Sequence, residues 1–264
     1  IQGILHPGDI TDDNSIVQWN QFREIIQKVN KNCFMAFCTG NHDYEYEEKN
    51  GIYAISNRLS TRFQHFIRYE PDELITTFNG DITNSLLTTT ILDEDYYVLA
   101  LEFGPRAEVI NWANELIVRN RTRKFIILTH AYLYINDIRY SYADFNTNQA
   151  WSPSSYFFSD NVSDAEVIWE ELIKNNDNVK MVVCGHNSFS GLLVSVNSYG
   201  NDIIQIRFDP TNKPNGGDGW LQIIEFKNEE NEGERDLTFI KGIIYNPIYN
   251  SFDSLSAGHF FLKY

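Results

Sequence analysis

The chain has 264 residues, of which 42% are hydrophobic and 14% aromatic, and it carries a formal net charge of −15. This composition indicates a globular protein with enough chain to bury a large core, and it excludes a disordered polymer. The acidic balance argues against a nucleic-acid or anionic-membrane partner, and we find no apolar run near the ~20 residues that a membrane-spanning helix needs.

Four short apolar stretches end in side chains that bind metals or transfer protons. An apolar run bounded by glycine or a polar residue is typical of a buried strand in a parallel sheet. Open sheets of this kind bind ligands beyond the carboxyl ends of their strands, so four such ends predict a convergent metal site. In chain order, residues 3–7 precede Gly8-Asp9, residues 33–38 precede TGNHD at 39–43, residues 125–128 precede Thr129-His130, and residues 179–184 precede Gly185-His186.

The segments between these strands predict helices that cover the sheet. Apolar residues recur in them at helical spacing, which gives each helix one buried face. Residues 44–50 are acidic, and we expect them to be exposed. The predicted helices cover residues 16–30, residues 55–66, a segment that Gly104-Pro105 opens with proline at the first helical position, and residues 165–173 after a capping box of Ser163 and Glu166.

Further apolar segments predict additional strands. Residues 86–92 and 96–103 are separated by an acidic turn and form an expected hairpin. No helix signal separates the last strand-like segments, so we expect them to pair antiparallel and complete a second sheet. The fold class is therefore α/β, with two packed mixed sheets flanked by helices in a single domain, 1–264. The last segments are residues 192–196, 202–208, 220–226 and 237–245.

Residues 131–160 form a long segment rich in tyrosine and tryptophan after the third strand. Loops of this length in a compact domain are usually lids or binding loops. The alternative is that the aromatic side chains pack the segment onto the body. The sequence leaves both interpretations open.

The motif order resembles that of the calcineurin-like metallophosphoesterases. That family carries Asp-x-His, Gly-Asp-x-x-Asp, Gly-Asn-His-Asp/Glu, His and Gly-His-x-His in this order. GDITD at 8–12, GNHD at 40–43, His130 and His186 match it. The resemblance spans nearly the whole chain and implies a two-sheet β-sandwich flanked by helices, which hydrolyses phosphoesters with a metal-activated water. Asp12 stands where the related purple acid phosphatases carry tyrosine, which disfavours that branch.

The same resemblance implies a ligand set. Asp9 matches the residue that bridges two metal ions, and Asn41, His130 and His186 match the other ligands of one ion. Nitrogen and oxygen ligands suit a divalent transition metal, Fe, Mn or Zn, and the family uses two ions. The sequence leaves open whether this chain binds one ion or two.

The resemblance also implies the proton-transfer residues. His42 matches the residue that protonates the leaving oxygen, and we interpret Asp43 as the residue that orients it and favours its charged form. His6 lies within the first strand, and we interpret it as structural. The substrate is expected to be a phosphoester, with phosphatase and phosphodiesterase activity both open and the oligomeric state unpredicted.

The sequence departs from the family pattern at two places. No Asp-x-His precedes Ile1, and Ser188 occupies the second histidine of Gly-His-x-His. We expect an upstream or separately supplied first strand, and we expect the chain from Ile1 to be nearly inactive alone. The alternative is a non-catalytic relative that acts as a binding or structural protein.

The cysteines, the start of the chain and two sequence triplets bear on the redox state and processing of the protein. The three cysteines cannot all pair, and we expect Cys38 and Cys184 to be buried free thiols. A start at Ile1 predicts a processed or partial product, and two Asn-x-Ser/Thr triplets leave open a secreted protein.

Overall fold

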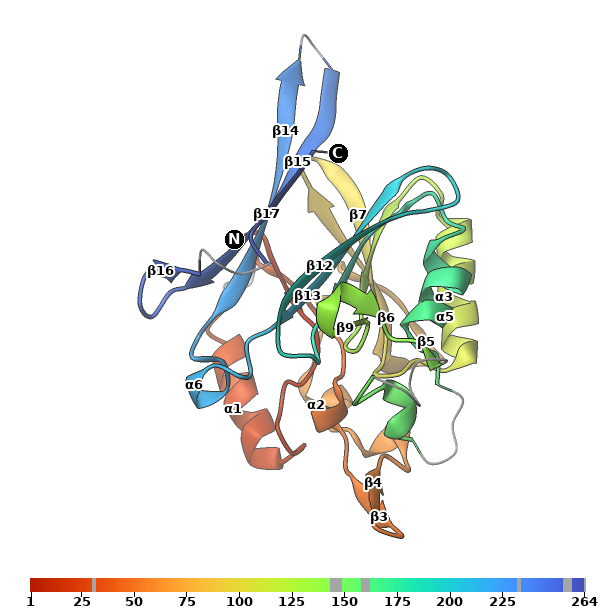
Figure 1. Ribbon diagram of the computed structural model, residues 1–264, viewed down its shortest axis with the longest axis vertical. Helices are drawn as coiled ribbons and strands as arrows, with labels where there is room; N and C mark the ends of the chain where they lie inside the picture. The colour runs from red at the N-terminus through yellow and green to blue at the C-terminus, as the bar shows by residue number, and fades with distance from the viewer. Residues whose placement is uncertain (30–31, 143–148, 158–161, 232–233, 254–257, 264) are drawn as a thin grey trace.

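A seven-stranded mixed sheet forms the centre of the protein, here a computed structural model (Figure 1). The structure describes residues 1–264 except 30–31, 143–148, 158–161, 232–233, 254–257 and 264. The large sheet has the order β12-β13-β11-β8-β7-β6-β5. Its strands are β5 (Leu74–Phe78), β6 (Asp81–Ile91), β7 (Glu94–Ala100), β8 (Lys124–Leu128), β11 (Val179–Cys184), β12 (Phe189–Val196) and β13 (Asp202–Asp209).

Two smaller sheets pack on one face of the large sheet. Strands β1 (Gly3–His6) and β2 (Phe34–Phe37) form a parallel pair. The C-terminal sheet has the order β14-β15-β16, and β17 also pairs with β15. The bounds of its strands are β14 (Leu221–Asn231), β15 (Glu234–Asn246), β16 (Ser251–Phe252) and β17 (Phe260–Lys263).

Alternate side chains of β8 pack against different layers of the protein on the two faces of the large sheet. Ile126 and Leu128 belong to the core cluster shared with β1, β2 and the C-terminal sheet. Phe125 and Ile127 belong to the cluster on the opposite face, which includes α3 (Ala107–Arg119). Successive residues of a strand point to opposite faces, so an unbroken apolar strand implies a sheet covered on both sides. The sequence-based fold class, two sheets flanked by helices in a mixed α/β protein, is confirmed.

Helices form the outer layers (Figure 1). On the far side of β1 and β2, α1 (Ile16–Ile26) packs Trp19 against Phe37 and Phe63. None of the described helices is long and apolar enough to span a membrane. The remaining short helical segments are η1 (Asn41–Asp43), η2 (Arg58–Ser60), α2 (Phe63–Phe66), η3 (Ile135–Asp137), η4 (Pro153–Ser155), α5 (Ala165–Ile168), its π-helical continuation η5 (Trp169–Ile173) and α6 (Pro214–Gly217).

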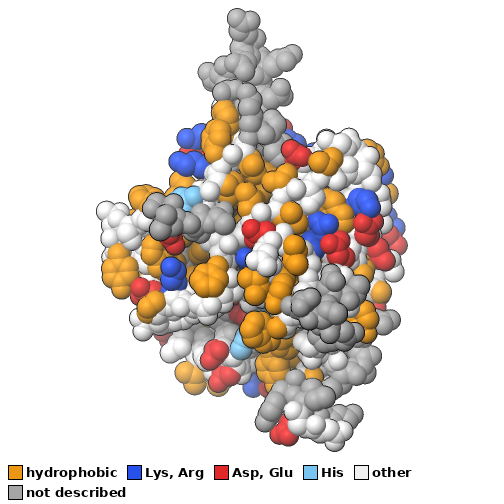
Figure 2. All heavy atoms as spheres, viewed as in Figure 1, with side chains coloured by type: hydrophobic (Ala, Val, Ile, Leu, Met, Phe, Trp, Pro, Cys, Tyr) orange, Lys and Arg blue, Asp and Glu red, His pale blue; other side chains and the backbone are white. Residues whose placement is uncertain are grey.

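The C-terminal sheet turns its second face to solvent. Ile224 and Leu262 face the core, whereas their neighbours Ile223 and Phe261 are exposed, as the alternation of strands requires. Figure 2 shows hydrophobic side chains on the surface near the base of the β14–β15 hairpin, which extends away from the body in Figure 1.

The prediction of a helix over residues 55–66 is wrong. The structure has a one-turn helix, α2, preceded by strand β4 (Ile52–Ala54), which pairs with β3 (Glu47–Lys49). Ile55 is buried in a bridge to Phe157, and Leu59 is 72% exposed. The apolar residues of this segment therefore have the spacing of a helix but do not form one buried helical face.

Two predicted helix starts are displaced. Arg106 is the N-cap of α3, so Pro105 precedes the cap and is not the first helical residue. Asp164 caps α5 by accepting from the N–H of Val167, and Ser163 does not serve as the predicted cap. The second carboxylate oxygen of Asp164 also accepts from the N–H of Tyr142, which holds the capping side chain in place.

The predicted antiparallel strands divide between two sheets. β12 pairs antiparallel with β13, as expected, but β13 is parallel to β11 and extends the large sheet. Of the four predicted segments, only the last two lie in the second sheet, as the antiparallel strands β14 and β15. The predicted hairpin of β6 and β7 is confirmed, and Cys38 and Cys184 are buried free thiols.

The long segment 131–160 contains the short strands β9 (Leu133–Tyr134) and β10 (Ile138–Arg139). Tyr132 and Tyr140 are buried in the core, which agrees with the packing interpretation for these side chains. Residues 143–148 and 158–160 of the segment lie outside the described residues. Trp151 is exposed, and its carbonyl reaches the site described next.

Candidate metal centre

The loop after β1 places Asp9 against the loop after β2. Gly8 and Asp9 both have positive φ angles, 93° and 50°, which form a tight turn. A Cβ atom at Gly40 would lie 2.1 Å from Asp9 Oδ1 and 2.3 Å from Asp9 N. No real Cβ atom approaches so closely, so only glycine at position 40 allows the two loops to pack together.

Asp43 ties the same two loops together. Its Oδ2 accepts from the N–H groups of Gly40, at 2.9 Å, and Ile10, at 3.2 Å, and its Oδ1 accepts from Thr11 N at 2.9 Å. Burial and the nearby Asp9 charge raise the pKa of Asp43 to about 6, although these N–H donors oppose the shift. Asp43 is therefore a clamp for the turn that presents Asp9.

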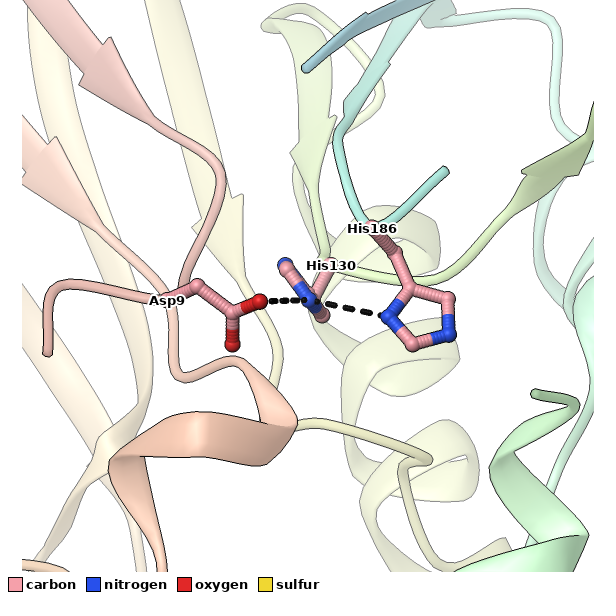
Figure 3. A group of neighbouring side chains, drawn as sticks. All are labelled: Asp9, His130 and His186. Atoms are coloured by element: carbon pink, nitrogen blue, oxygen red, sulfur yellow. Dashed lines mark hydrogen bonds and ion pairs between the residues drawn. The ribbon is translucent and has the colours of Figure 1, made fainter. Parts of the chain in front are cut away.

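Asp9, His130 and His186 meet at the carboxyl ends of β1, β8 and β11 (Figure 3). His130 Nε2 lies 3.1 Å from Asp9 Oδ2 and 3.2 Å from His186 Nδ1. All three ligand atoms lie within 4.8 Å of one another. One carboxylate and two imidazoles at this spacing are a donor set for a divalent transition metal.

The outer nitrogen of each histidine is held by a backbone carbonyl. His130 Nδ1 lies 2.5 Å from Pro7 O, and His186 Nε2 lies 2.7 Å from Trp151 O. A carbonyl oxygen can only accept, so each outer nitrogen donates its N–H when the ring is neutral. This leaves a lone pair on the inner nitrogen of each ring, as metal-binding histidines require.

Asn41 supplies a further oxygen that has no partner. The residue is 2% exposed, and its Nδ2 donates to the Tyr46 hydroxyl at 2.8 Å. Its Oδ1 is buried and has no hydrogen-bond partner among the described residues. An unsatisfied buried acceptor costs about 1–3 kcal/mol. A bound cation would satisfy this oxygen, so the residues present fit a metal ion.

The charges of the cluster favour the same interpretation. Burial alone would raise the pKa of Asp9, but His130 outweighs it and lowers that pKa to about 2. Burial opposes the charged form of His130 as well, yet Asp9 raises its pKa above the usual value. Burial and the neighbouring His130 lower the pKa of His186 to about 3. Asp9 is thus ionised and His186 neutral, which are the states that bind metals, whereas an ion must displace the proton that Asp9 favours on His130.

His42 lies beside this cluster and is more exposed. Its backbone N–H donates to Asp9 Oδ1 at 3.0 Å, and its side chain is 43% exposed. The ring Nδ1 lies 2.6 Å from Asp12 O and 3.6 Å from Asp12 Oδ1. The ring is therefore fixed through Nδ1, and Nε2 is the nitrogen left to exchange a proton.

The interpretation of Asp43 as the residue that orients His42 is corrected by these contacts. The carboxylate of Asp43 accepts from backbone donors, and the carboxylate beside the His42 ring is that of Asp12. Our sequence reasoning missed this role, although Asp12 stands three residues after Asp9 in the GDITD motif.

The structure brings Asp9, His130 and His186 together, joins the His42 backbone to Asp9, and places Asn41 directly before His42 in η1. His6, which we interpreted as structural, is buried against Phe22 and Phe37, and burial lowers its pKa to about 4. Tyr46 and Trp151 are further contacts of the ligand residues. Residues 44–50 were expected to be exposed, but Tyr44 is buried and Tyr46 partly buried. No sequence pattern marks either Tyr46 or Trp151.

Comparisons with known proteins identify the family. The model of the calcineurin-like phosphoesterase family matches residues 2–187. The chain is also similar to the uncharacterized protein YvnB of Bacillus subtilis (strain 168), with 25% identity over 244 residues. That alignment covers 86% of this chain but 16% of YvnB, so the chain spans a small part of that relative. The family match covers well over half of the chain and all four predicted ligand residues, and the chain belongs to the calcineurin-like phosphoesterase family.

Proposed function

We propose that this chain is a hydrolase of phosphoesters that uses a divalent transition metal held by Asp9, Asn41, His130 and His186. Family membership suggests metal-dependent phosphoester hydrolysis. The observation that carries the proposal is the cluster itself, in which the ligand atoms of two imidazoles and one carboxylate lie within 4.8 Å of one another. The unpartnered Oδ1 of Asn41 adds a fourth donor.

Each ligand residue has a defined part in this scheme. A bound divalent ion supplies charge neutralisation for the phosphoryl group and a water of lowered pKa as the nucleophile. Asp9 contributes the negative charge that holds the ion, and Pro7 O and Trp151 O keep the two imidazoles in the required tautomers. The donor set suits Fe, Mn or Zn and does not choose among them.

His42 is the proposed acid for the leaving oxygen. Its Nδ1 is held by the Asp12 carbonyl, so Nε2 carries the proton that an alkoxide leaving group takes up. Its exposure is greater than that of His130, in accord with a group that meets substrate. The Asp12 carboxylate also lies 3.6 Å from the ring Nδ1.

The experiment that tests the proposal is hydrolysis after metal removal and return. The protein is stripped with a chelator, dialysed and assayed on an alkyl phosphodiester and an alkyl phosphomonoester, with and without Mn²⁺. The two substrates separate phosphodiesterase from phosphatase activity. Because the chain spans a small part of its relative YvnB, any longer natural form of the protein is assayed beside it.

We expect Mn²⁺-dependent turnover of at least one ester, restored by the ion after chelation. Metal binding without turnover of either ester, in both forms of the protein, would contradict the hydrolase proposal. That outcome would favour the alternative in which the chain binds or organises another molecule.

A further inference from the structure

Asn41 can bind a metal in only one of the two orientations of its side-chain amide. The two ends of a side-chain amide have nearly the same shape, but only the oxygen can bind a cation. If the amide were flipped about its Cβ–Cγ bond, the NH₂ group would face the metal, and its positively polarised hydrogens would repel the cation. The orientation that places the oxygen on a cation therefore also needs a hydrogen-bond acceptor for the NH₂ group.

The neighbour in contact with this amide is Tyr46. Its hydroxyl lies 2.8 Å from Asn41 Nδ2 and accepts from it. Because the oxygen and nitrogen diverge from the same carbon, fixing Nδ2 on the hydroxyl directs Oδ1 elsewhere. That oxygen is buried and has no hydrogen-bond partner in the part of the chain that the structure describes.

The Tyr46 ring is itself held in place from two sides. It lies edge-on to the His42 ring, with centroids 6.3 Å apart, and it contacts the Tyr156 ring at 6.1 Å. Tyr156 in turn packs against Phe103, which contacts both His130 and His186. The hydroxyl position is thus coupled to the same aromatic wall that borders the two ligand imidazoles.

The Tyr46 hydroxyl supplies the acceptor that the amide needs when its oxygen faces a cation. With Oδ1 on the ion, Nδ2 is left as a donor in a residue that is 2% exposed, and the hydroxyl accepts from it at 2.8 Å.

We propose that Tyr46 is a positioning residue of the metal centre, whose hydroxyl fixes the Asn41 amide so that Oδ1 faces the ion. The inference rests on the metal site of the proposed function. Partners of metal ligands typically contribute 10–100-fold to metal affinity. Tyr46 acts through Asn41, so its contribution disappears when the amide is absent.

The test is a double-mutant cycle read by Mn²⁺ affinity, measured from the EPR signal of free Mn²⁺ during titration. Tyr46→Phe keeps the ring contacts with His42 and Tyr156 and removes only the hydroxyl. We expect it to weaken Mn²⁺ binding by about 10–100-fold, while the metal-free protein remains folded. In the Asn41→Ala background, Tyr46→Phe should cause no further loss, because the two residues act as one unit.

Tyr245→Phe is the matched control. Tyr245 also joins its hydroxyl to an asparagine, donating to Asn250 Oδ1 at 3.0 Å, but it lies in β15 of the C-terminal sheet. This variant should bind Mn²⁺ as the wild type does.

Two results would overturn the inference while leaving the metal site intact. One is a Tyr46→Phe variant that binds Mn²⁺ as tightly as the wild type. The other is an equal loss from Tyr46→Phe with and without Asn41, which would mean that the hydroxyl acts independently of the amide. A wild type that binds no Mn²⁺ at all would overturn both this inference and the proposed function.

Discussion

Asp9→Asn should abolish useful metal binding. The substitution keeps the size of the side chain but removes the only negative charge of the cluster formed with His130 and His186. Removing a partner of a ligand costs up to about 100-fold in affinity, so the loss of a charged ligand should exceed that value. Asparagine is chosen because Asp9 has a φ of 50°, a conformation that asparagine adopts more readily than alanine. Mn²⁺ affinity and metal-dependent turnover are measured together.

The control is Asp177→Asn, which also removes one carboxylate charge but lies at the amino end of β11 and not at the end that carries His186. Asp177 precedes β11, whereas His186 follows it, and Asp177 forms an exposed ion pair with Arg121. Asp177→Asn should leave Mn²⁺ affinity unchanged. An Asp9→Asn protein that folds and still binds Mn²⁺ like the wild type would remove Asp9 from the ligand set.

His42→Ala should lower kcat by about 10²–10⁴-fold on an alkyl phosphoester, the usual range for a general acid or base. KM should change less, because the protonated imidazole acts mainly in the transition state. The effect should nearly vanish on an activated aryl ester, whose leaving group needs no proton. Turnover of the two esters by the same metal-loaded variant is the measurement.

His65→Ala is the control for this variant, because His65 is exposed on α2. It should leave both rates unchanged. Unchanged kcat of His42→Ala on the alkyl ester, with metal still bound, would show that another group supplies the proton.

The strands that deliver the ligands could be predicted from the sequence because they are apolar on both faces. β8 and β11 agree closely with the predicted residues 125–128 and 179–184. The helix predicted over 55–66 failed because its spacing was produced by residues with unrelated environments: Ile55 is in a bridge and Leu59 is in solvent. Periodicity identifies an element reliably only where one continuous face is buried.

The ligand set could be predicted because its residue types are fixed by metal chemistry. The groups that hold it could not, because they act through backbone atoms or through a residue of no special type. Trp151 contributes its carbonyl, which any residue has. Asp12 and Asp43 are both carboxylates in neighbouring motifs, and only the hydrogen bonds of the folded chain show that Asp43 clamps the loops while Asp12 lies beside His42.

The most direct test of the metal centre is the metal content of the chain, counted per molecule by elemental analysis after purification without chelator and with metal supplied. Asp9, Asn41, His130 and His186 should hold a transition metal in an amount equimolar with the chain. His130→Ala, which removes the central imidazole, should lose most of that metal. Absence of metal from the wild-type chain, or full retention of metal by His130→Ala, would contradict the account.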